Sequence, residues 1–94
     1  MSAKHLRNIS ISKWKAFLEL ALCKYIGTVG GHEKWTRSDI LRPIIFQTHI
    51  DPIPEFIIKN NLRNLNYTKK DFFEIIEGKK IVIKQADKYI FKNQ

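Results

Sequence analysis

Two adjacent glycines, Gly30 and Gly31, constrain the fold of this 94-residue chain more than any other feature. The five residues before them, 25–29, are rich in strand-forming side chains. A glycine pair after such a segment is typical of a two-residue hairpin turn, because both turn positions need a positive φ. The pattern therefore predicts an antiparallel hairpin in which Val29 lies opposite His32 and the second strand runs over residues 32–36.

The period of two in a strand assigns the side chains of this hairpin to two faces. The predicted register places Ile26 opposite Trp35, and we expect this pair on the core-facing side, with Thr28 and Glu33 near its edge. The other face is expected to be solvated and to carry four side chains: Tyr25, His32, Lys34 and Thr36.

Apolar residues at helical spacing predict a helix before the hairpin, with Ser10 or Ser12 as its N-cap. Its inner face would consist of Trp14, Phe17, Leu18, Ala21 and Leu22. A third strand is expected over residues 43–48, with Pro43 at its first position or on an edge, and His49 stands where this strand ends.

Two further helices are predicted after the third strand. The segment 51–54 contains two prolines and is a suitable entry to a helix, whose inner stripe would be Ile58, Leu62 and Leu65. In the next helix, Thr68 is the predicted N-cap and Asp71 has the position of a capping-box acid. Gly78 is the expected stop of that helix.

The resulting order, α-β-β-β-α-α, indicates an α+β fold in which helices pack on one face of a three-stranded antiparallel sheet. His32 lies on the other, open face. We divide the chain into a loose N-terminus (1–9), a folded domain (10–78) and a C-terminal extension (79–94). The β-prone pieces of that extension, 81–83 and 89–91, are compatible with an edge strand or with a tail.

The charge of the chain is strongly basic, with 17 Lys and Arg against nine Asp and Glu and a net charge of +8. The excess lies in residues 1–30 and 61–94. Such an excess favours a polyanionic partner, either nucleic acid or an acidic protein, although basic charge also serves solubility alone. No apolar run is long enough for a membrane helix, and residues 1–10 do not resemble a secretory signal. We therefore expect a cytoplasmic protein that does not bind membranes.

No phosphate-binding loop, dinucleotide-binding glycine motif or serine-nucleophile elbow occurs in the sequence. The three histidines, His5, His32 and His49, have no pair at the spacing of a helical metal site, so we expect neither a metal nor a cofactor. The single cysteine, Cys23, is expected to be a buried structural thiol. A solvated role is expected for Arg37 and Arg42, although either is able to guide an RNA backbone.

The run from Cys23 to Trp35 resembles the core of the HicA toxins, the mRNA interferases of HicAB toxin–antitoxin pairs. In that family a helix leads into a strand, then a glycine, a small residue and a histidine, and then a second strand. The third strand ends in a further histidine and is followed by a helix. Residues 46–49 and 55–65 match this second half, and the resemblance extends over residues 10–77.

The resemblance implies a fold similar to the double-stranded-RNA-binding domain and identifies His32 as the catalytic histidine. It also implies mRNA as substrate and a HicB-type antitoxin protein as partner. The family glycine corresponds to Gly30. The chain differs from the family at three positions: Gly31 replaces a Ser or Thr, Glu33 replaces a common second histidine, and Gln47 replaces a frequent proline.

RNA carries its own nucleophile, because the 2′-hydroxyl attacks the adjacent phosphorus once a base removes its proton. An imidazole changes charge near neutral pH, so His32 is suited to act as that base without a metal. Lys34 and the N–H of Gly31 are the candidates to neutralise the phosphate. His49 would act as an acid or hold the loop. The alternatives are a non-catalytic RNA-binding module of the same fold and a domain that binds an acidic protein.

Overall fold

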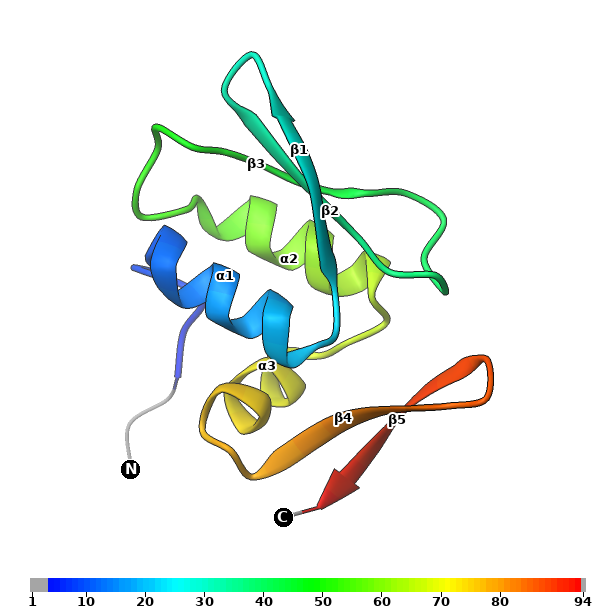
Figure 1. The fold of residues 1–94 in the computed structure, drawn as a ribbon. Coiled ribbons are helices and arrows are strands. Elements are labelled where there is room, and N and C mark those ends of the chain that lie inside the picture. The colour runs from blue at the N-terminus through cyan, green and yellow to red at the C-terminus, as the bar shows by residue number, and fades with distance from the viewer. Residues whose placement is uncertain (1–3, 94) are drawn as a thin grey trace.

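The computed structural model of the protein describes residues 4–93, which form three helices and two antiparallel sheets (Figure 1). β1, β2 and β3 make a three-stranded sheet in that order, and β4 pairs with β5 in a separate hairpin. The α+β class and the three-stranded antiparallel sheet are thus confirmed. The elements are α1 (Ile11–Leu20), β1 (Lys24–Val29), β2 (His32–Thr36), β3 (Ile44–Gln47), α2 (Glu55–Asn64), α3 (Lys69–Ile76), β4 (Lys80–Gln85) and β5 (Lys88–Asn93).

The turn between β1 and β2 is the one that the glycine pair predicts. Val29 pairs with His32, and Gly30 and Gly31 have φ values of 58° and 79°. L-residues with a side chain rarely adopt such angles, so the glycines allow the chain to reverse within two residues. This reversal fixes His32 as the first residue of β2.

The predicted pairing of Ile26 with Trp35 is wrong, because β1 contains a bulge between Tyr25 and Gly27. Tyr25 takes the place opposite Trp35, and the two rings meet edge to face with centroids 5.9 Å apart. Ile26 is the extra residue and is 54% exposed. One inserted residue reverses the face of every side chain before it, so Tyr25 lies on the side of Trp35 and not on the open face.

α1 begins where predicted, because the Ser10 hydroxyl accepts a hydrogen bond from the Lys13 N–H at 3.0 Å. Trp14, Phe17 and Leu18 are buried, as expected for its inner face. The assignment of Leu22 to that face is wrong. The helix ends before Leu22, which turns the chain with a φ of 65° and is exposed.

The two later helices follow their sequence signals. Ile58, Leu62 and Leu65 are buried along α2. Thr68 and Asp71 form the predicted capping box at the start of α3. Gly78 has a φ of 78° just after that helix, and the next N–H bonds back to the carbonyl of Glu74 at 2.8 Å, which completes a Schellman turn.

The core lies between the sheet and the helices, with three aromatic rings at its centre. Trp14 is stacked on both Phe17 and Phe72, at centroid distances of 5.1 and 5.9 Å, and the rings of Phe17 and Phe72 meet at a tilt, 4.8 Å apart. α1 and α2 cover the face of the sheet that carries Trp35 and Phe46 (Figure 1). This arrangement leaves the opposite face of the sheet open.

The segment before α1 is packed onto this core. Leu6 and Ile9 are buried, and Ile9 forms an isolated antiparallel bridge with Ile53. The expectation of a loose N-terminus is therefore wrong for residues 6–9, because two apolar side chains within a polar segment are enough to anchor it. The first three residues of that predicted segment lie outside the described residues.

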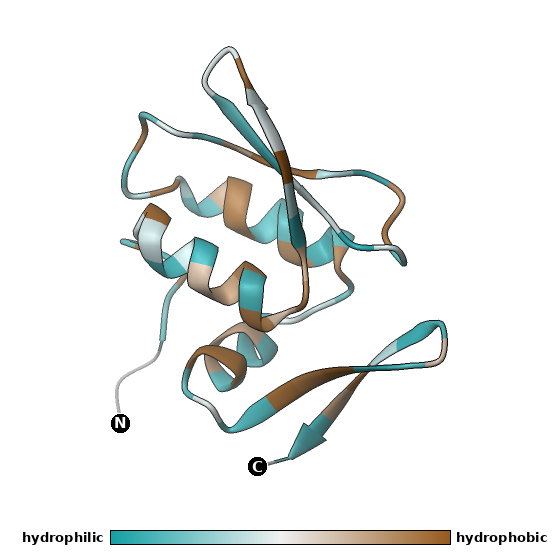
Figure 2. Cartoon of the chain, viewed as in Figure 1, coloured by the Kyte–Doolittle hydropathy of each residue, from teal (hydrophilic) through white to brown (hydrophobic). Residues whose placement is uncertain are grey.

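The C-terminal extension forms a two-stranded hairpin of its own. It is therefore neither an edge strand of the three-stranded sheet nor an unstructured tail. The middle of β4 is strongly hydrophobic (Figure 2), and Val82 within it is buried. Lys80 contacts the carboxylates of Asp71 and Glu74 on α3 at 2.9 and 3.0 Å. The hairpin is therefore attached to α3, and neither of its strands pairs with the three-stranded sheet.

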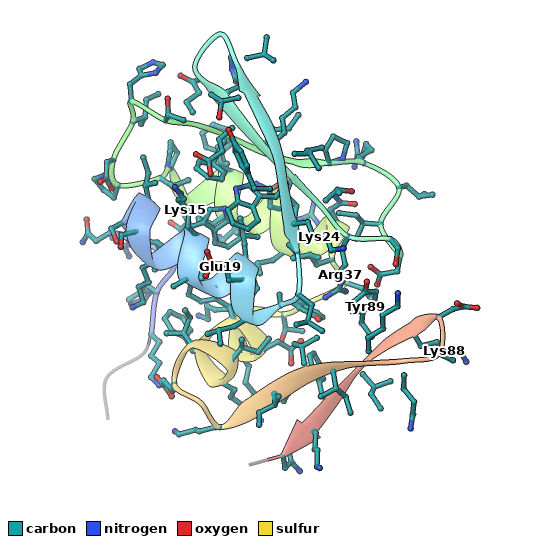
Figure 3. The ribbon with its side chains drawn as sticks, viewed as in Figure 1. Lys15, Glu19, Lys24, Arg37, Lys88 and Tyr89 are labelled. Carbon is teal, nitrogen blue, oxygen red and sulfur yellow. The ribbon has the colours of Figure 1, made fainter. Side chains whose placement is uncertain are left out.

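Arg37, directly after β2, is buried between this hairpin and the rest of the fold, and its predicted solvated role is wrong. Figure 3 shows Arg37 next to Tyr89 of β5, whose ring centroid lies 4.2 Å from the guanidinium carbon. The guanidinium donates to the Ala21 carbonyl (2.9 Å), to the Tyr67 hydroxyl (2.7 Å) and to both carboxylate oxygens of Asp39 (2.7 and 2.9 Å). Burial opposes the charge, but the hydrogen bonds with Asp39 and Tyr67 outweigh it and raise the pKa of Arg37.

We predict that Arg37→Ala lowers the free energy of unfolding by about 3 kcal/mol, because it leaves the buried Ala21 carbonyl and the partly buried Tyr67 hydroxyl and Asp39 carboxylate without their donor. For a domain of this size the melting temperature should fall by roughly 10 °C or more. The matched control is Arg42→Ala, which truncates an exposed arginine five residues away. Calorimetric melts of the two variants provide the measurement, and equal melting temperatures would contradict the interpretation.

The hydrogen bonds of Asp71 lead to a prediction about how the free energy of unfolding depends on pH. Its burial acts to raise the pKa, but hydrogen bonds from the Thr68 N–H and from Lys80 overcome this and hold the pKa of Asp71 below its usual value of 3.8. The folded state then binds fewer protons than the unfolded state. The contribution of Asp71 to the free energy of unfolding is therefore complete above pH 3.8 and is lost as the pH falls through the lowered pKa.

Asp71→Asn should therefore flatten the loss of stability below about pH 4. Asp87→Asn, in the exposed turn of the β4–β5 hairpin, is the control and should keep the wild-type acid profile. Urea unfolding at a series of acid pH values measures the difference. Identical slopes for Asp71→Asn and the wild type would show that Asp71 is not the group responsible.

Candidate functional site

The open face of the three-stranded sheet carries basic and neutral side chains. Alternation directs Lys24, His32 and Lys34 to this face, together with Ile45 and Gln47 of the neighbouring β3. The only acidic residue in these three strands is Glu33, which faces the helices. A polyanion approaching the open face therefore meets positive charge and no strand carboxylate.

Glu33 is held on the covered face by two partners. The indole N–H of Trp35 donates to its carboxylate at 2.7 Å, and the ammonium group of Lys15 on α1 lies 3.7 Å away. Glu33 is buried, with 6% exposure. The residue that differs from the HicA pattern directly after His32 thus helps to fix β2 to α1 and lies away from the open face.

His32 is exposed at the start of β2, between Val29 of β1 and Gln47 of β3. Its imidazole has no hydrogen-bond partner among residues 4–93. The ring is therefore accessible to a ligand on the open face. This is the placement that the glycine pair and the strand alternation predict.

The second histidine of the candidate site, His49, lies against the glycine turn. A Cβ atom added to Gly31 would be 3.4 Å from the Nδ1 atom of His49, which leaves room for ordinary contact only. The N–H of Thr48 donates to the Gly31 carbonyl at 2.9 Å and fixes this approach. The structure therefore brings Gly31, His32 and His49 together at one end of the sheet.

Gly30 and Lys34 lie on either side of this group. Nothing is within 4 Å of the position that a Cβ of Gly30 would occupy, so this glycine forms the open tip of the turn. Lys34 is two residues beyond His32 on the same face, and it pairs with Gly27 on one side and Ile45 on the other. Because Gly27 has no side chain, the flank of Lys34 towards β1 is uncovered.

A cleft of 320 Å³ opens beside His32, at the free edge of β3. Its walls combine side chains of the open face with side chains from the loop after β3 and from the start of α2. Sequence reasoning missed the contribution of Ile50 and Phe56. The sequence contains one signal for such a role. Phe56 is apolar but falls outside the spacing of the inner stripe, Ile58, Leu62 and Leu65, so it is expected to face away from the core. The residues that line the cleft include His32, Ile45, Gln47, Ile50, Pro54 and Phe56.

A larger cleft of 840 Å³ lies at the opposite end of β3, between residues 39–43 and α2. Arg42 and Arg63 line it together with three asparagines of α2. Arg42 is exposed there, in agreement with its predicted solvated position. Ile45 lines both clefts, but His32 does not line this one, and its arginines and asparagines suit contact with an anionic backbone.

Cys23 takes no part in the open face. The thiol is buried, as predicted, and burial raises its pKa to about 11. A thiol with a raised pKa is protonated at neutral pH and is a poor nucleophile. Across the part of the chain that the structure describes, no cluster of three or more His, Cys, Asp or Glu side chains is arranged to bind a metal ion.

Comparison with protein-family models, with curated proteins and with solved structures finds no match to this chain. None of the helices within residues 4–93 has the length and apolarity needed to cross a membrane.

Proposed function

We propose that the protein is a HicA-like toxin, a metal-independent endoribonuclease that cleaves mRNA with His32 as general base. The observation that carries this proposal is the exposed imidazole on a basic sheet face without strand carboxylates, next to a glycine turn and a second histidine. The order α1-β1-β2-β3-α2 is also that of a double-stranded-RNA-binding domain, which supports RNA as the ligand.

In the proposed reaction, His32 takes the proton of a ribose 2′-hydroxyl, and the 2′-oxygen attacks the adjacent phosphorus. The bond from phosphorus to the 5′-oxygen breaks, which leaves a 2′,3′-cyclic phosphate and a 5′-hydroxyl. The departing 5′-oxygen takes its proton from His49 or from water. Lys34 and the N–H of Gly31 stabilise the charge that develops on the phosphate oxygens.

The proposed partner is a HicB-type antitoxin that covers the same face. An acidic surface on that protein would compete directly with RNA for Lys24 and Lys34. The alternative function, a non-catalytic RNA-binding module, shares the binding face and differs only in the role of His32. The experiments below separate the two.

We predict that His32→Ala lowers RNA cleavage by at least about 10²-fold and abolishes growth inhibition, because a positioned base typically contributes 10² to 10⁴ in rate. His32 is exposed, so the free energy of unfolding should change by no more than about 0.5 kcal/mol. His5→Ala, which truncates an exposed histidine outside the site, should cleave like the wild type. Gel assays of a long RNA in EDTA, with a melt of each variant, measure both quantities.

The same assay has a chemical control for the mechanism. Replacing the 2′-hydroxyl at a mapped cleavage position with hydrogen should prevent cleavage there, because the nucleophile is removed. Cleavage by the His32→Ala variant, or at the deoxy position, would exclude this mechanism. RNA binding without any cleavage by the wild type would favour the non-catalytic alternative.

The position of Lys34 on the open face leads to a prediction about how RNA binding depends on salt concentration. If its ammonium group neutralises one phosphate, Lys34→Gln should weaken the binding of single-stranded RNA and reduce the slope of log K against log salt by about 0.7. Lys88→Gln, in the hairpin remote from the open face, should leave the slope unchanged. Fluorescence anisotropy in the His32→Ala background gives the slopes without cleavage. Equal slopes for the two lysine variants would remove Lys34 from the interface.

A further inference from the structure

The cleft beside His32 is lined mainly by apolar side chains, and His32 and Gln47 are its two polar ones. Phe56 at the start of α2 is 64% exposed, and Ile50 and Ile45 are 38% and 37% exposed. Single exposed apolar residues are ordinary, but these three line one cavity next to the candidate base. We propose that this cleft binds the nucleobase of the nucleotide whose 2′-hydroxyl is attacked, and that the protein therefore cleaves unpaired RNA. This inference rests on the proposed ribonuclease function.

The connection between the cleft and the reaction follows from the structure of a ribonucleotide. The base is attached at C1′, and the 2′-hydroxyl stands on the adjacent carbon. His32 forms part of the wall of the cleft, so a base inside it places its own ribose beside the imidazole. The bound base is consequently the one on the 5′ side of the bond that breaks.

The side chains suit a flat, partly polar occupant. The exposed ring of Phe56 offers a stacking surface, and stacking on an aromatic side chain is tolerant of base identity. Gln47, opposite His32 in the strand register, supplies an amide that both donates and accepts hydrogen bonds. An apolar side chain of a protein partner would use the stacking surface but would leave this amide without a polar partner.

Charge around the cleft favours a polyanion. Lys34 lies on the same face, in position to meet a phosphate next to the bound ribose. The two acidic residues close to the cleft in sequence are already engaged. Asp51 accepts a hydrogen bond from the Ile11 N–H at 3.1 Å, and Glu55 pairs with Lys59 at 3.4 Å.

The same geometry excludes a paired base. In a double helix each base is stacked between its neighbours, and proteins reach it only from a groove edge. A base that enters the cleft beside His32 must leave that stack. The cut therefore falls in a single-stranded segment or a loop, even though the order of the elements is that of a fold that binds duplex RNA.

The test uses the full-length protein and a short single-stranded RNA whose cleavage position has been mapped. Phe56→Ala should lower kcat/KM by about 10- to 100-fold through the loss of stacking, and Phe56→Trp should retain activity. Leu41→Ala, which truncates an apolar side chain that is 98% exposed and outside the cleft, should cleave like the wild type. Melts of all three variants confirm that each is folded.

A modified substrate tests the position of the base. Ribose without a base on the 5′ side of the cut keeps its 2′-hydroxyl, yet it should slow the wild type by a factor similar to that of Phe56→Ala. It should slow Phe56→Ala little further, because the interaction is already lost. A complementary strand that pairs the mapped position should suppress cleavage by the wild type.

The outcomes separate this inference from the proposed function. If His32→Ala abolishes cleavage while Phe56→Ala, the base-free ribose and the duplex are all cut normally, the ribonuclease stands and the base site is wrong. If the wild type does not cleave RNA, the binding of RNA is compared between the His32→Ala protein and the same protein with Phe56→Ala added. Weaker binding by the double variant would support a base-binding cleft in a protein without catalytic activity. If Phe56→Ala affects only the binding of a protein partner, the cleft is a protein-docking site and the inference is overturned.

Discussion

The guanidinium of Arg37 connects four parts of the chain that are distant in sequence. It bonds to the end of α1 through the Ala21 carbonyl and to the start of α3 through Tyr67. The aromatic ring of Tyr89 in β5 covers it from the side of the hairpin. Because Arg37 directly follows β2, these contacts determine where that strand ends. A solvated side chain at this position would leave the end of β2, the two helices and the hairpin without a common anchor.

The fixed end of β2 determines the chemistry of the open face. From Arg37 backwards, Trp35 and Glu33 point to the helices, so Lys34 and His32 point away from them. The hydrogen bond between Trp35 and Glu33 holds the inward set in register. The outward direction of His32 is therefore a consequence of core packing at the other end of the strand, and no contact of the imidazole itself is required.

Signals that act over a few residues were sufficient to predict much of this structure. The glycine pair determines the turn and the start of β2, and Thr68 with Asp71 determines the start of α3, because both depend on neighbouring backbone groups alone. The bulge at Ile26 was not predictable in this way, since its cause lies in how β1 fits against Trp35. Burial of Arg37 likewise requires partners 16, 30 and 52 residues away in sequence.

The candidate site likewise has a part that short-range signals predict and a part that depends on tertiary packing. His32, Gly31 and Lys34 follow from the hairpin register, whereas the position of His49 against Gly31 depends on the loop that Thr48 begins. The cleft depends on a longer-range arrangement, because the start of α2 must lie beside β3 before Phe56 and His32 can line the same cavity.

The net charge of a sequence segment is a poor guide to the charge of the open face. Residues 31–60, which supply His32, Lys34 and Phe56, contain four basic and four acidic residues and are neutral as a segment. The open face is nevertheless basic, because Lys24 and Lys34 lie on it while Glu33, the acidic residue of these strands, is turned inward. The sign of the potential at the site thus depends in part on the inward direction of Glu33, and a Glu33 turned outward would weaken it without any change in composition.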